Sequence, residues 1–156
     1  MEGSELIKFF GKSIGLELEL DESNSCSFAA DEFTVTFTDL PEFRAVALIC
    51  DLGEPRVDNN EKLYKAMLEA NYVFNSTYGA TLCLNGESGH CAINKVLPCD
   101  ILDNDKFMAE VEQFVNIGEF WNNVVRGYAE AADQESPGED AAADAGSFDA
   151  ANFMPV

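Results

Sequence analysis

Residues 33–38, FTVTFT, place an apolar side chain at every second position with threonine in between. This two-residue period is typical of a strand with one buried face and one solvent-facing side. Further strands are expected before it at 26–30 and after it at 45–52, with turn-rich residues between them. Consecutive strands joined by short connections pair antiparallel, so this part of the chain predicts a meander.

A second pair of strands is expected later in the chain. Residues 80–84 and 90–97 are apolar, strand-like runs, and Asn-Gly-Glu-Ser-Gly at 85–89 lies between them. Such a turn sequence between two runs predicts a β-hairpin. Residues 16–20, LELEL, also alternate, and they are expected as a half-buried strand or the approach to one.

Three helices are expected around these strands. Ser4 is a suitable N-cap for the first helix, and Gly15 a suitable stop. Asp58, with Glu61 three residues later, has capping-box spacing for the second helix. Asp103 can cap the last helix, which continues for about twenty residues or more by its three- and four-residue apolar spacing.

The predicted order is therefore α-β-β-β-α-β-β-α, which indicates an α+β fold with a twisted antiparallel sheet packed by helices. Residues 1–128 are expected to form one domain. From 129 to 156 the chain has no lysine or arginine and is rich in Ala, Asp, Glu and Gly, which indicates a flexible acidic tail. Apolar residues near its end raise the hypothesis of a removable lid.

The charge of the chain restricts its partners. Twenty-nine acidic and nine basic residues give a net charge of −20, which disfavours nucleic acid and anionic membranes as partners and favours basic or amphipathic ones. Solubility alone is a second explanation for this charge. No apolar run reaches the ~18–20 residues that a membrane-spanning helix needs. The N-terminal stretch lacks a basic segment, so a cytoplasmic protein is expected.

Residues that support chemistry are sparse. His90 is the only histidine, and the five cysteines contain no Cys-x-x-Cys pair. Zinc sites use closely spaced pairs, and no glycine motif for phosphate is present. We therefore expect no catalytic residue, no metal and no cofactor. A thiol-dependent enzyme using Cys83 or Cys91 stays as a minor alternative.

Four stretches carry a family resemblance. Residues 52–55, LGEP, and 61–71, EKLYKAMLEAN, resemble the second-helix signature of class I type III secretion chaperones, the Tir chaperone (CesT-like) family. Residues 79–84 are similar to that family's glycine-rich fourth strand, and 96–98 to its passage into the last helix. The resemblance covers about 5–128 and leaves the acidic tail outside it.

The resemblance implies a bacterial, cytoplasmic homodimer with no enzymatic activity. Such a protein binds the N-terminal segment of a type III secretion effector in extended form, keeps it soluble and presents it for secretion, with the secretion ATPase as a further partner. By carry-over, the dimer interface is expected at Leu63, Tyr64, Met67 and Leu68. Effector-binding residues are expected at Leu6, Phe9, Phe10, Ile14, Val35 and Phe37.

Two other readings remain open. The same fold could serve as a protein-binding or sensory module without a role in secretion, which an adjacent effector gene would argue against. The acidic tail could imitate nucleic acid.

Overall fold

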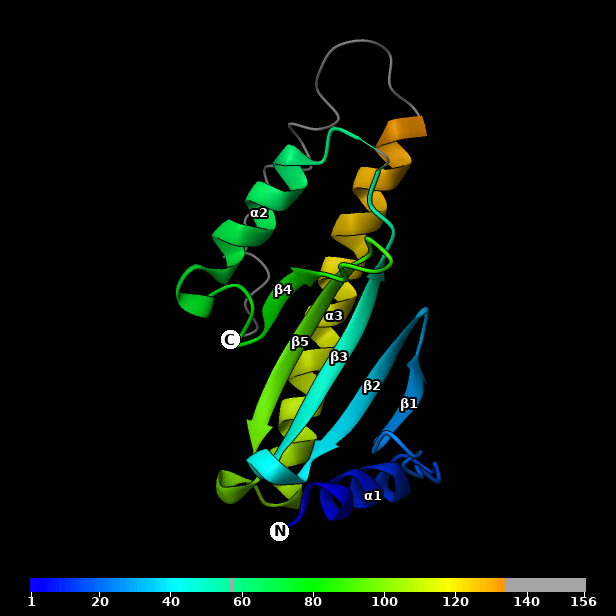
Figure 1. The fold of residues 1–156 in the computed structure, drawn as a ribbon, viewed down its shortest axis with the longest axis vertical. Helices are drawn as coiled ribbons and strands as arrows, with labels where there is room; N and C mark the ends of the chain where they lie inside the picture. Colours follow the sequence, from blue (N-terminus) through cyan, green and yellow to red (C-terminus); the bar gives the residue numbers. More distant parts are fainter. Residues whose placement is uncertain (57, 134–156) are drawn as a thin grey trace. The chain divides into compact units, whose positions relative to one another are not determined.

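The computed structural model describes residues 1–56 and 58–133 (Figure 1). The helices and strands are α1 Gly3–Ser13, β1 Ser25–Ala30, β2 Phe33–Leu40, β3 Ala45–Gly53, α2 Glu61–Asn71, β4 Thr81–Leu84, β5 Cys91–Pro98 and α3 Asn104–Asp133. Short 3-10 turns, η1 Pro41–Phe43, η2 Tyr72–Phe74 and η3 Cys99–Ile101, join some of them. The sheet is antiparallel with strand order β1-β2-β3-β5-β4, which confirms the α+β prediction and its element order.

Two compact units share β3, β5 and α3. The first unit comprises residues 1–50 and 94–116, and the second comprises 51–93 and the chain from 117. The first contains α1, β1 and β2, and the second contains α2 and β4.

Aromatic rings form the centre of the first unit. Phe10 of α1 lies 5.3 Å from Phe28 and 5.4 Å from Phe37 between ring centroids, and Phe107 of α3 lies 5.8 Å from Phe37. Phe33, Val35 and Phe37 of β2 are buried, while the side chains between them are more exposed, as the alternation predicts. The apolar face of β2 therefore packs with α1 and the start of α3.

The start of α1 differs from the expectation. The N-cap is Glu2, not Ser4, because the Glu2 and Glu5 side chains form a reciprocal capping box. Gly3 permits a close approach here, since a Cβ on it would lie 2.8 Å from the Val46 Cγ2 atom. The helix can therefore begin directly against the sheet.

Residues 16–20 do not form a strand, contrary to the alternation of LELEL. The Leu16 N–H donates to the Gly11 carbonyl at 2.8 Å. The Leu18 side chain packs directly against Gly11, so closely that a Cβ atom on Gly11 would lie only 2.9 Å from the Leu18 Cγ. The alternation instead reflects one buried leucine, Leu18, packed on α1 between exposed neighbours.

In the second unit, Asn60 rather than Asp58 is the N-cap of α2. The Asn60 Nδ2 donates to the Arg56 carbonyl at 2.7 Å, and the Arg56 Nε donates to the Tyr128 carbonyl of α3 at 2.7 Å. These buried bonds fix the loop before α2, so the helix begins at Glu61, later than an Asp58 cap would allow.

The last helix begins as predicted. The Asp103 Oδ1 accepts the Lys106 N–H at 2.8 Å, which is an N-cap bond. Nearby backbone and side-chain N–H groups hold the pKa of Asp103 below its usual value. α3 continues to Asp133, and the expected tail from 134 to 156 lies outside the described residues.

Candidate protein-binding surfaces

The predicted effector-binding residues divide into two groups. Leu6, Phe10, Val35 and Phe37 are between 0% and 6% exposed and belong to the core of the first unit. Phe9 and Ile14 are 36% and 42% exposed, and Leu16, just after α1, is 42% exposed. We call these three exposed side chains the α1 patch; at 3.6 residues per turn, Phe9 and Ile14 lie about 140° apart around the helix, so they offer separate contacts. The buried four position α1, and the patch offers apolar side chains to a partner.

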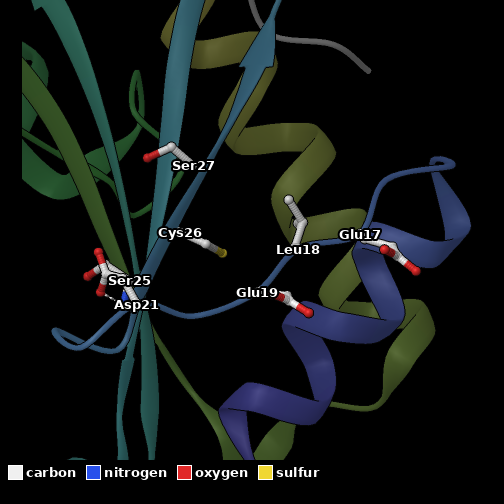
Figure 2. Close-up of a pocket in the computed structure, with 7 residues that line it drawn as sticks. All are labelled: Glu17, Leu18, Glu19, Asp21, Ser25, Cys26 and Ser27. Carbon is white, nitrogen blue, oxygen red and sulfur yellow. Dashed lines mark hydrogen bonds between the residues drawn. The ribbon is translucent and has the colours of Figure 1, made fainter.

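A surface cavity of about 480 Å³ lies in the same unit (Figure 2). Figure 2 shows Cys26 of β1 extending toward the connection that carries Leu18. The lining residues are Glu17, Leu18, Glu19, Asp21, Ser25, Cys26 and Ser27. Glu17 and Glu19 come from the connection after α1, and Asp21 lies beside Ser25 of β1, so carboxylates flank the cavity (Figure 2) and suit it to an extended, basic segment.

The cavity follows the free edge of β1. The Asp39 N–H donates to the Asn24 carbonyl at 2.8 Å, and Ser25 pairs with Thr38 in the continuing register. Because hydrogen-bonded and non-hydrogen-bonded pairs alternate, the backbone groups of Ser25, Ser27 and Ala29 point outward. Asp21 satisfies both backbone groups of Ser25. The Asp21 N–H donates to the Ser25 carbonyl, and the Asp21 Oδ1 accepts the Ser25 N–H, each at 2.9 Å.

The predicted dimer residues also divide. Leu63 and Met67 are 0% and 4% exposed and pack inside the second unit, Tyr64 is half-buried, and Leu68 is 70% exposed. The next turn adds exposed apolar side chains, listed with Leu68 as the α2 patch: Leu68, Tyr72, Val73 and Phe74.

The backbone of the α2 patch is strained. Val73 has φ 60° and Phe74 has φ 56°, in a left-handed region that a β-branched residue rarely adopts. Tyr72 follows Leu68 at helical spacing but was not expected in the interface, and Val73 and Phe74 have no such spacing. Their signal is three consecutive large apolar residues after a helix end.

A third apolar surface lies at η1 and η3 in the first unit. Phe43 and Ile101 are 75% and 67% exposed. The two turns are joined by the Cys99 N–H, which donates to the Arg44 carbonyl at 2.8 Å, and by an Arg44–Asp100 ion pair at 2.5 Å. This surface was not expected from the sequence either.

The groups considered for catalysis lie in unfavourable settings. His90 lies at the surface, with its Nδ1 3.0 Å from the Asp51 Oδ2. In the part of the chain that the structure describes, its hydrogen-bond partner is thus a carboxylate and not a cysteine thiol. Burial, with Cys83 and Asp51 nearby, raises the pKa of Cys91 to about 11. At neutral pH this thiol is protonated and a poor nucleophile.

Within 1–56 and 58–133, no cluster of three or more His, Cys, Asp or Glu side chains is arranged to hold a metal ion. No helix in that part of the chain combines the length and apolar character needed to cross a membrane.

Several solved structures have a similar fold. The HopA1-SchA chaperone-effector complex matches with a TM-score of 0.63 and 22% identity, over 77% of this chain and 92% of that one. A chain of the ExsC-ExsE complex matches with a TM-score of 0.68 and 21% identity, over 80% and 97%. A chain from the structure of the Yersinia pestis type III secretion chaperone SycH in complex with a fragment of YscM2 matches with a TM-score of 0.59 and 17% identity. The match covers 76% of this chain and 98% of that one.

No curated protein matches the sequence. A family model, however, matches residues 5–122, which is most of the described chain. Its description is the Tir chaperone protein (CesT) family, and structures of type III secretion chaperones share the fold. The chain therefore belongs to the Tir chaperone protein (CesT) family.

Proposed function

We propose that this protein is a bacterial cytoplasmic chaperone that binds the N-terminal segment of a type III secretion effector in extended form, keeps it soluble and presents it for secretion. Membership of the Tir chaperone family supports this, as does the likeness to a chain from a chaperone-effector complex. The observation that carries it is the α1 patch in the same unit as the open edge of β1.

An extended client can use both features. Its backbone pairs with the outward groups of Ser27 and Ala29, and its apolar side chains pack on the α1 patch. Strand addition places few demands on sequence, because it uses the backbone. The surface suits a segment that has not yet folded.

Charge favours basic clients and keeps the chaperone soluble. Glu17, Glu19 and Asp21 line the cavity beside β1, and the whole chain has a net charge of −20. Such a field speeds the approach of a positively charged segment, and it keeps chaperones with exposed apolar side chains from aggregating.

A homodimer through α2 is part of the proposal. Of the expected interface residues, Leu68 and Tyr64 are available to a partner. Leu63 and Met67 are buried and hold α2 against the rest of the second unit. Tyr72, Val73 and Phe74 extend the contact area. The secretion ATPase is the further partner that this role implies.

The second candidate is a protein-binding or sensory module without a role in secretion. The η1–η3 surface, outside the proposed client and dimer contacts, is the observation that favours another partner. A gene for an effector beside the gene of this chain would argue for the chaperone.

The test uses the N-terminal segment of the protein encoded by the neighbouring gene, with binding followed by fluorescence anisotropy. Ile14→Glu removes an apolar contact of the α1 patch and is expected to weaken binding at least about tenfold, since ~1.4 kcal/mol corresponds to a factor of ten. Ala109→Glu adds the same charge at an exposed position of α3 in the same unit and serves as the control. Equal affinities for both variants and the native chain would contradict the α1 patch as the client site.

A further inference from the structure

The outermost strand β4 has a free edge on the side away from β5. The Asn85 N–H donates to the His90 carbonyl at 2.8 Å, which sets the register of the hairpin. In that register Cys83 lies opposite Ala92, in agreement with the Cys83 Sγ contact to the Ala92 carbonyl at 3.6 Å. The alternation of pairs then directs the backbone groups of Leu82 and Leu84 toward the free edge.

The side chain of Asn71 occupies the middle of this edge. Its Nδ2 donates to the Leu82 carbonyl at 3.0 Å, and its Oδ1 accepts the Leu82 N–H at 2.9 Å. An amide side chain has one donor and one acceptor side, like a peptide group, so Asn71 pairs with Leu82 as one residue of a neighbouring strand would. Asn71 is the last residue of α2, which lies beside β4 (Figure 1).

Apart from its short length and the neighbouring α2 (Figure 1), the strand carries little of the protection that edge strands usually have. Thr81–Leu84 contains no charge and no proline, and Leu84 is 48% exposed. Outer strands generally use lysine, proline or a bulge to prevent pairing with other chains. At the start of the edge the Ala80 N–H donates to the Thr77 carbonyl at 3.0 Å, which leaves Asn71 as the central block.

We propose that Asn71 closes the edge of β4 against strand pairing with the β4 of a second copy. A second β4 is the fitting partner, because an uncharged, apolar strand can pair antiparallel with itself without like charges meeting. While Asn71 holds Leu82, two copies can associate through side chains but not through a continuous sheet. The inference concerns the strand edge alone and does not depend on the proposed chaperone activity.

A purely structural role makes a different prediction. If Asn71 only attaches α2 to β4, its loss lowers stability and creates no new binding. If it blocks the edge, its loss creates an affinity for a strand of the β4 sequence. Uptake of such a strand is therefore the readout, and stability is recorded separately by circular dichroism.

The experiment uses the full chain and a fluorescent peptide that repeats residues 79–85, with alanine in place of Cys83. Asn71→Ala is expected to bind this peptide at least tenfold more tightly than the native chain. The same peptide with N-methyl groups at alternate backbone positions should not bind, since it cannot form the strand bonds. Asn123→Ala, an exposed asparagine on α3 in the same unit, is the matched control and should behave like the native chain.

A folded Asn71→Ala variant that takes up no more peptide than the native chain would overturn the proposal. Asn71→Asp provides the second variant if Asn71→Ala unfolds. It keeps an acceptor for the Leu82 N–H but sets a carboxylate against the Leu82 carbonyl, so it should bind peptide more tightly than the native chain. Native-like uptake by folded Asn71→Asp would also overturn the proposal.

Discussion

Phe9 and Phe10 are adjacent in α1 but have different surroundings. Phe10 is 6% exposed and touches the rings of Phe28, Phe37 and Phe107, whereas Phe9 is 36% exposed. One neighbour contributes to the core and the other to the α1 patch. At the scale of the residue, exposure separates side chains that hold the fold from side chains that can meet a partner.

This contrast gives a stability prediction. Phe10→Ala should lower the free energy of unfolding by about 3–5 kcal/mol, because it leaves a cavity among aromatic rings. Phe9→Ala should lower it by less than about 1 kcal/mol and should instead weaken client binding. Urea denaturation of both variants measures the difference. Equal losses would show that the two rings are not divided as described.

Cys91 gives a prediction on pH. Folding raises the pKa of the Cys91 thiol from 9.0 to about 11. Below about pH 9 the thiol is protonated in both the folded and the unfolded chain, and the folded state keeps its full stability. As the pH rises through about 11 the unfolded chain loses this proton more readily, and that stability is lost. At ~1.4 kcal/mol per pKa unit, the loss is about 2–3 kcal/mol. Unfolding of native protein and Cys91→Ala between pH 8 and 11 should show a shallower decline for the variant. Parallel curves would contradict the raised pKa.

At the scale of the element, α2 separates packing from association. Met67 is 4% exposed and Leu68 is 70% exposed, on successive positions of one helix. Met67→Ala should cost about 2–5 kcal/mol of stability. Leu68→Glu should change stability by less than about 0.5 kcal/mol while weakening self-association. Light scattering and urea denaturation distinguish the two effects, and a Leu68→Glu variant with unchanged association would exclude the α2 patch from the interface.

The turn after α2 gives a further prediction. Val73 adopts φ 60°, so its backbone is strained. Its side chain is 62% exposed, so removing it should cost little packing energy within the chain. Val73→Gly should raise the thermal midpoint, with a gain of about 0.5–1 kcal/mol, because glycine adopts positive φ without a Cβ clash. Val73→Ala keeps the clash and is the control. A lower midpoint for Val73→Gly would mean that contacts of the side chain outweigh the strain.

The element order could be predicted from the sequence, because the alternation at 33–38 and the hairpin signal at 85–89 each depend on local pattern. Helix starts were less predictable. Asp103 caps α3 as expected, but Glu2 and Asn60 replace Ser4 and Asp58. A capping box with Glu5 fixes Glu2, and the bond from Asn60 to the Arg56 carbonyl fixes the loop before α2, and both depend on the folded chain. Leu68 of the α2 patch was expected in the interface from the family resemblance, whereas Tyr72, Val73 and Phe74 become visible as surface only through their exposure.

At the scale of the whole molecule, charge governs association. With a net charge of −20, the chain should bind a basic client more weakly as salt rises, because salt screens the attraction between charges. Raising the salt concentration from 50 to 500 mM should lower the association rate more than it raises the dissociation rate. Stopped-flow measurements separate the two rates. A salt-independent association rate would show that steering by charge has no part in binding.

The central claim is that this fold binds an effector segment in an extended state. The most direct test is light scattering with NMR of the labelled N-terminal segment from the neighbouring gene's product, mixed with the full chain. We predict a complex containing two copies of the 17.1 kDa chain, with the segment showing strand-like shifts and no tertiary fold of its own. A segment that stays free, or that binds as a folded domain, would contradict the account.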